Sequence, residues 1–151
     1  MEKYLCHSCR RRMPKPIGEP NCKKCGKPLV DERKEFCTDC GKKHHVYTQG
    51  KAVFVYEGGI RNSMYRFKYG NKREYAEFYA NAAVEKYGVW LNKIKAEVLI
   101  PIPMYSRKKR LRGYNQAEVF ARELGRKAGI LVDEHLVRRV RNTIPQKELN
   151  E

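Results

Sequence analysis

The sequence lacks a long hydrophobic run, and this absence excludes a membrane-spanning helix. The longest apolar stretch, Val98 to Tyr105, is interrupted by Pro101 and Pro103, whereas a helix that crosses a bilayer needs about 20 apolar residues. No apolar segment of a signal peptide precedes Cys6, because only five residues separate this cysteine from the start of the sequence. These absences predict a soluble, cytoplasmic protein without membrane insertion.

Acidic residues are scarce relative to basic ones. Asp and Glu number 17 against 33 Lys and Arg, which gives a formal net charge of +16 at pH 7 over 151 residues, with a local concentration of positive charge at 107–112. This excess indicates a polyanionic partner, either nucleic acid or a phosphorylated metabolite. A solvated basic surface would carry the same charge. Apolar residues at 41% and aromatic residues at 11% exclude a disordered tail.

Cysteine is absent after residue 40, and the six cysteines form three pairs with a two-residue gap: Cys6 and Cys9, Cys22 and Cys25, Cys37 and Cys40. Such a gap lets both thiolates of one tight turn, a zinc knuckle, reach the same ion. Two knuckles complete the tetrahedral set of four sulfurs that Zn²⁺ prefers. Gly26 and Gly41 directly follow the second cysteine of their pairs and predict backbone with positive φ. The sequence therefore predicts a structural zinc ribbon over residues 1–45.

The best closed set of zinc ligands consists of two neighbouring pairs: Cys22, Cys25, Cys37 and Cys40. Cys6 and Cys9 either replace one of these pairs or belong to a second ribbon, so one zinc ion and two zinc ions both remain open. His44 and His45 could substitute for a ligand, although such histidines are more often surface residues. A disulfide framework needs an oxidising compartment, and a redox pair needs a βαβ context; the sequence indicates neither.

Residues 46–151 alternate between strand and helix patterns, which is typical of an α/β domain with a parallel sheet. Apolar runs predict strands at 52–56, 98–102 and 130–132, and helical spacing predicts helices at 60–70, 74–87 and 115–128. Asn115, followed three residues later by Glu118, predicts an N-cap, and Gly129 predicts the end of the last helix. A loop of about a dozen residues is expected before Asn115.

This loop is the strongest candidate for an anion-binding site. In open α/β sheets, ligands bind beyond the carboxyl ends of the strands, and helix N-termini attract anions. The loop supplies Arg107, Arg110, Arg112 and Gly113 immediately before a helix. Arginine can hold a phosphate through two parallel hydrogen bonds, which a lysine cannot. An exposed basic loop is the alternative, and the polar cluster at 138–146, taken alone, would be a solvated connector.

Five motifs occur in a characteristic order. They are the C-x-x-C pairs, Lys68-Tyr-Gly70, Leu99-Ile-Pro-Ile-Pro103, Arg107 followed by Arg112-Gly-Tyr-Asn-Gln-Ala117, and Arg139-x-Arg141-x-Thr143-x-x-Gln146. Together they resemble the ComF family, bacterial competence-associated proteins with a zinc-ribbon head on a phosphoribosyltransferase-like domain. The resemblance runs over essentially the whole chain, and its most specific part is the Arg-Gly-Tyr-Asn-Gln signature.

The resemblance implies a partial type I phosphoribosyltransferase-like domain over 46–151, and phosphoribosyl pyrophosphate with Mg²⁺ as ligands of a complete member. The implied phosphate-binding residues are Arg107, Arg110, Arg112, Gly113, Tyr114, Asn115, Gln116, Arg139, Arg141, Thr143 and Gln146. Implied partners are single-stranded DNA and a protein of the DNA-uptake machinery. Family members continue with paired aspartates and a Thr-Thr-Gly-x-Thr loop that grips the ribose phosphate. Neither motif occurs here, so the chain is expected to be a C-terminally truncated, catalytically incomplete member.

Three functions are consistent with these features. The first is a phosphoribosyltransferase-like enzyme, in which arginine and Mg²⁺ stabilise the departing pyrophosphate. The second is a non-catalytic module that binds nucleic acid through the ribbon and the basic loop. The third is an interaction protein whose ribbon docks a partner in DNA uptake.

Overall fold

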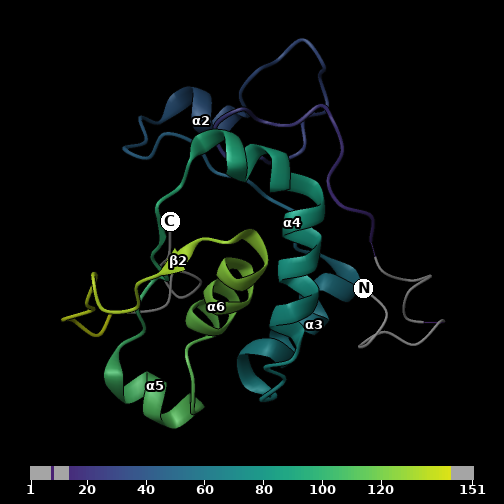
Figure 1. Cartoon of the computed structure of the whole chain (residues 1–151). Coiled ribbons are helices and arrows are strands. Elements are labelled where there is room, and N and C mark those ends of the chain that lie inside the picture. Colours follow the sequence, from purple (N-terminus) through teal and green to yellow (C-terminus); the bar gives the residue numbers. More distant parts are fainter. Residues whose placement is uncertain (1–7, 9–13, 144–151) are drawn as a thin grey trace. The chain divides into compact units, whose positions relative to one another are not determined.

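The computed structural model of the chain describes residue 8 and residues 14–143. The chain divides into two compact units, Met1–Tyr65 and Arg66–Glu151, whose elements are shown in Figure 1. The helices and strands with defined bounds are α2 (Thr38–Lys42), α3 (Gly58–Tyr69), α4 (Tyr75–Ile94), β1 (Val98–Leu99), α5 (Ser106–Arg112), α6 (Gln116–Ala128) and β2 (Leu131–Val132).

The first unit contains a tight turn at its first described cysteine pair. The Cys22 N–H donates to Lys27 O and the Gly26 N–H donates to Cys22 O, both at 2.8 Å. Gly26 has a φ of +77° as predicted, and a Cβ at this position would lie 2.6 Å from Ala52 N. The same prediction for Gly41 is wrong. Its N–H donates to Cys37 O at 2.9 Å, and it lies inside α2, because the chain continues from the third pair as a helix.

The strand predicted at 52–56 is not formed. Val53 O accepts a hydrogen bond from Ile17 N at 2.8 Å, but no ladder continues from this bond within the part of the chain that the structure describes. Strand propensity depends on packing against a neighbouring strand, so a β-branched run alone does not become a strand.

The two central helices differ from their predicted bounds. Helix α3 begins at Gly58, two residues earlier than predicted, and buries Phe67. Helix α4 continues past Gly88, where the prediction ended it, to Ile94. Gly88 lies inside the helix, and a Cβ at this position would meet only Val84 Cγ1, at 3.7 Å. The buried face of α4 includes most of the residues that the helical spacing predicted: Phe78, Tyr79, Ala82 and Ala83.

Strands β1 and β2 pair in parallel, with Val98 opposite Leu131 and Leu99 opposite Val132. The predicted parallel arrangement is therefore confirmed, as a small two-stranded sheet. β1 ends at Leu99 rather than at residue 102, because Pro101 has no N–H to donate to a ladder. Helix α6 packs against both α4 and β2 (Figure 1).

The loop predicted before Asn115 contains the helix α5. Its sequence is basic and its one large apolar side chain, Leu111, is 82% exposed, so it has no apolar face for helical spacing to reveal. Helix α6 has the predicted ends: the Asn115 side chain accepts from Ala117 N, and Gly129 is left-handed with a φ of +68°. Among the described residues, no helix is long and apolar enough to span a membrane.

Candidate metal centre and anion-binding corner

Four cysteines of the first unit converge on one point. The sulfur atoms of Cys22, Cys25, Cys37 and Cys40 all lie within 4.8 Å of one another, and Cys25 Sγ lies 3.8 Å from Cys37 Sγ. A tetrahedral zinc ion with Zn–S bonds of about 2.3 Å places its sulfurs roughly 3.8 Å apart. The donor set therefore fits Zn²⁺ in both chemistry and spacing. Cys6 and Cys9 lie outside the described residues.

The electrostatics of this cluster favour a bound cation. Burial raises the pKa of Cys40 to about 12, and the neighbouring cysteines add to this effect. For Cys22 burial acts in the same upward direction, but backbone hydrogen bonds at Cys37, Cys25 and Lys24 outweigh it and lower the pKa to about 6. Four thiolates at this spacing repel one another, so the metal-free cluster retains protons that a divalent cation would displace.

The two histidines that follow Cys40 do not join the four sulfurs. His44 is exposed, and only cysteines make up the cluster that the described residues form. The ring of His45 packs 5.1 Å from the ring of Tyr47, and its buried Nε2 has no hydrogen-bond partner among the described residues. The structure thus favours an all-sulfur ligand set.

In the second unit, two basic clusters that are distant in sequence come together. Lys108 Nζ on α5 donates to Thr143 O at 3.1 Å, and Arg139 donates to the Thr143 hydroxyl. We call this surface, α5 together with residues 138–143, the basic corner. All five predicted phosphate-binding arginines lie on it, as does Thr143, whereas Gln146 lies outside the described residues.

The cations of α5 differ in what they contact. Lys109 forms an ion pair with Glu118 at 2.7 Å. Arg112 donates to Gln116 Oε1 at 2.6 Å and its guanidinium carbon stacks 4.8 Å from the centre of the Tyr69 ring. Two other arginines of the helix are exposed and form no ion pair within the described part of the chain: Arg107 and Arg110. These two charges are available to an anionic ligand.

The buried residues of the family signature support the corner from within. Tyr114 is 4% exposed and Asn115 is 1% exposed. The Tyr114 hydroxyl donates to Phe67 O, and Asn115 Nδ2 donates to Ile102 O at 2.9 Å. Burial raises the pKa of Tyr114 despite the nearby guanidinium groups, so its hydroxyl stays protonated. These two side chains hold the turn between α5 and α6, and they present no donor to solvent.

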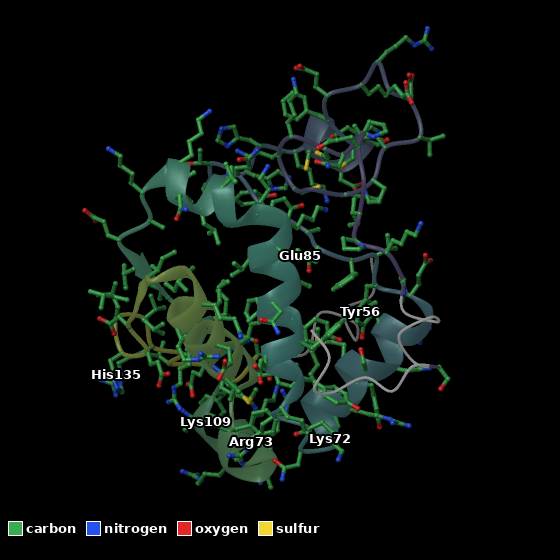
Figure 2. The ribbon with its side chains drawn as sticks, turned by 45° about the vertical axis from the view of Figure 1, so that its right-hand side comes forward. Tyr56, Lys72, Arg73, Glu85, Lys109 and His135 are labelled. Atoms are coloured by element: carbon green, nitrogen blue, oxygen red, sulfur yellow. The ribbon has the colours of Figure 1, made fainter. Side chains whose placement is uncertain are left out.

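Arg73 is a contributor that the sequence did not reveal. It lies between α3 and α4 and is labelled in Figure 2. Its guanidinium carbon lies 4.7 Å from the centre of the Tyr114 ring, and its Nη2 donates to Gly113 O at 3.3 Å. An arginine 40 residues from its partner carries no local signal, so only the folded chain shows this contact.

Comparison with known proteins shows which proteins this chain resembles. A family model described as a double zinc ribbon domain matches residues 1–41, which include Cys6 and Cys9 as well as the four clustered cysteines. The chain is 28% identical over 134 residues to "Competence protein ComFC" of Bacillus subtilis, covering 83% of this chain and 53% of that protein. It is 27% identical over 150 residues to "Competence protein F" of Haemophilus influenzae, covering 97% of this chain and 63% of that protein.

Together, these matches support a ComF-family relationship for this chain. The resemblance inferred from the cysteine pairs and the Arg-Gly-Tyr-Asn-Gln signature is thereby confirmed. The chain spans 53% and 63% of the length of the two curated relatives that it matches. No solved structure matches it.

Proposed function

We propose that this ComF-family chain acts in DNA uptake and that its basic corner binds the phosphate groups of single-stranded DNA. Both curated relatives are named as competence proteins. The observation that carries the proposal is the contact between Lys108 and Thr143. This contact joins two basic segments beside Arg107 and Arg110, two exposed arginines of α5 that form no ion pair among the described residues.

The physical basis of the proposal is the neutralisation of phosphate charge. Each arginine that contacts a phosphate releases condensed counterions, so affinity falls as salt rises. The net charge of +16 favours encounter with any polyanion. The planar guanidinium group adds paired hydrogen bonds to phosphate oxygens that an ammonium group cannot form.

The double variant Arg107→Gln/Arg110→Gln tests this function. Fluorescence anisotropy with a labelled oligothymidine at several salt concentrations should show weaker binding. The slope of log affinity against log salt should fall by about 1.4, because each lost phosphate contact on a single strand is worth roughly 0.7. The matched control is Arg122→Gln/Arg126→Gln. It removes the same charge from the same unit, but its arginines are already paired with Glu134 and Glu123.

The control variant is expected to keep the salt slope of the unmodified chain. Equal losses of affinity and slope in both double variants would show that only net charge matters. An unchanged slope in Arg107→Gln/Arg110→Gln would remove the basic corner from the interface.

The same corner is also our candidate site for the pyrophosphate of phosphoribosyl pyrophosphate. In support, the parallel strand β1 leads through α5 to the capped N-terminus of α6, an order that suits the phosphoribosyltransferase-like domain expected from the family. Mg²⁺ would neutralise the diphosphate in such a complex. Adding phosphoribosyl pyrophosphate with Mg²⁺ to the same titration should displace the oligonucleotide. Transferase activity, a cytoplasmic location and a protein partner in DNA uptake remain predictions.

A further inference from the structure

Two motifs that lie far apart in the sequence meet beside α5 through stacked side chains. The guanidinium carbon of Arg112, in the Arg-Gly-Tyr-Asn-Gln signature, lies 4.8 Å from the centre of the Tyr69 ring in the Lys-Tyr-Gly motif. A second stack joins nearby residues of the same segments, with the guanidinium carbon of Arg73 4.7 Å from the centre of the Tyr114 ring. We call Tyr69 and Arg112 the stacked pair.

Arg112 is held in place by neutral groups. Its Nη1 donates to Gln116 Oε1 at 2.6 Å, and its guanidinium group stacks on an aromatic ring, a geometry that the planar guanidinium favours. Neither partner is a carboxylate, and Arg112 forms no ion pair within the part of the chain that the structure describes. The positive charge of Arg112 is therefore oriented without being neutralised.

The two stacks differ in their exposure to solvent. The Tyr114 side chain is 4% exposed, whereas that of Tyr69 is 56% exposed. The stack on Tyr114 therefore supports the turn between α5 and α6 from within, and the stacked pair presents aromatic surface to solvent. An exposed aromatic ring beside an arginine is the combination on which the bases of single-stranded nucleic acids stack.

The stacked pair and the exposed arginines of the basic corner lie on different sides of α5. Arg112 follows Arg107 by five residues and Arg110 by two, which at 3.6 residues per turn places it across the helix from both. Figure 2 shows the labelled Lys109 of α5 and Arg73 of the preceding loop at the same end of the molecule. A strand whose phosphates lie on Arg107 and Arg110 reaches the stacked pair by crossing the C-terminal end of this short helix.

We propose that the stacked pair binds a nucleobase of the strand whose phosphates the basic corner holds, and that it thereby selects single-stranded DNA over duplex DNA. This inference rests on the proposed function and adds a base-binding subsite to it. Phosphate contacts alone would favour the duplex, because its charge density is higher. The bases of a duplex are paired and stacked within the helix, so the stacked pair reaches a base only in a single strand.

The variant Tyr69→Leu tests the subsite in the full chain, by fluorescence anisotropy with two labelled strands. An oligothymidine and an abasic oligonucleotide of the same length carry the same phosphates and differ only in their bases. Tyr69→Leu should bind the oligothymidine roughly 5- to 100-fold more weakly, since stacking on an aromatic ring contributes this much per base. Its affinity for the abasic strand and its salt slope should not change, because no charge is removed.

Two further variants separate stacking from other effects of the substitution. Tyr69→Phe keeps the ring and should restore the discrimination between the two strands. The matched control is Tyr87→Leu, at a ring that also lies near a cation, 4.8 Å from Lys86 Nζ. Tyr87 is twelve residues into α4, about 18 Å along the helix from its first residue. This control should bind both strands as the unmodified chain does.

A duplex of the same length provides the last comparison. The preference for oligothymidine over this duplex should fall in Tyr69→Leu by the same factor as the affinity for oligothymidine. If Tyr69→Leu does not fold, the decision passes to Arg112→Lys, which keeps the charge and removes the planar stacking surface; it should lose the same discrimination.

The results distinguish failure of the subsite from failure of the proposed function. Equal losses of affinity for the oligothymidine and the abasic strand in Tyr69→Leu would overturn base stacking, as would no loss for either strand, and both leave the basic corner in place. An unmodified chain that binds no strand in a salt-dependent way would overturn the proposed function and the subsite together.

Discussion

Asn115 illustrates how a single residue can combine two structural tasks in this protein. Its Oδ1 accepts from Ala117 N at 3.0 Å and caps α6, while its Nδ2 donates to Ile102 O at 2.9 Å. A buried amide that satisfies two backbone groups leaves neither of them unpaired, which avoids a desolvation cost of about 1–3 kcal/mol per group. The side chain of this residue of the Arg-Gly-Tyr-Asn-Gln signature therefore contributes to the basic corner by shaping it.

The hydrogen bonds of Glu134 predict how the stability of the chain depends on pH. It accepts hydrogen bonds from Arg122, one of them 2.6 Å long between Nη2 and Oε2, and these bonds lower its pKa below the ordinary value of 4.5. A carboxyl group with a lowered folded-state pKa adds stability above its unfolded-state pKa. That contribution is lost as the pH falls through the folded-state value.

Glu134→Gln should therefore lower the free energy of unfolding by about 1 kcal/mol at pH 7, because the partner Arg122 is largely exposed. At pH 3 the loss should be smaller. Urea unfolding followed by the fluorescence of Trp90, the single tryptophan, measures the effect. Glu123→Gln, which breaks a surface pair with Arg126, should cost less than about 0.5 kcal/mol. An equal loss of unfolding free energy at pH 3 and at pH 7 would contradict a lowered pKa for Glu134.

At the scale of elements, the sequence predicted those whose signals are local. The N-cap at Asn115 and the stop at Gly129 depend on neighbouring residues, and α6 has both ends where they were expected. Helix α5 was missed because it is short and basic and lacks an apolar face. The strand at 52–56 was predicted wrongly, because strand formation needs a partner that sequence spacing does not identify.

The candidate sites follow the same division between local and distant signals. The two-residue gap predicted the cysteine pairs that converge in the structure. Arg73 went unnoticed, because its partner is brought near by folding and not by spacing. The contact between Lys108 and Thr143 spans 35 residues and was equally hidden, although the residues on each side of it were singled out.

Two glycines in helices provide a prediction at this scale. In α4, a Cβ at Gly88 would meet only Val84 Cγ1 at 3.7 Å, so Gly88→Ala should stabilise the chain by about 0.5–1 kcal/mol through helix propensity. In α6, a Cβ at Gly125 would lie 2.6 Å from both Ile130 O and Val132 Cγ2. Gly125→Ala should therefore destabilise the chain by about 1–3 kcal/mol, despite the same gain in helix propensity.

Urea unfolding followed by Trp90 fluorescence compares the two variants under identical conditions. Opposite signs are expected, because the two sites share helical backbone and differ only in the space around the glycine. Stabilisation by Gly125→Ala would show that α6 does not pack closely on β2.

At the scale of the whole molecule, the two units have different kinds of core. Among the described residues, the buried apolar side chains of the first unit are few, and two of the four are cysteines of the metal cluster: Ile17, Cys22, Cys37 and Ile60. The second unit buries an aromatic and aliphatic set from α3, α4, α6 and the turn before α6: Phe67, Ala76, Phe78, Tyr79, Ala80, Ala82, Ala83, Tyr114 and Ala121. We therefore expect the first core to depend on metal coordination and the second on apolar burial.

Removal of metal should consequently affect the two units unequally. With EDTA under reducing conditions, trypsin should cleave the many lysines of residues 23–43 faster, because a small ribbon without its ion loses most of its folding free energy. The urea midpoint reported by Trp90, which lies in α4 of the second unit, should stay within experimental error. Added Zn²⁺ should restore resistance to trypsin, and Mg²⁺ should not, because it prefers oxygen ligands to thiolates. A Trp90 midpoint that falls in step with metal loss would mean that the two units unfold as one, and that the metal centre stabilises the whole chain.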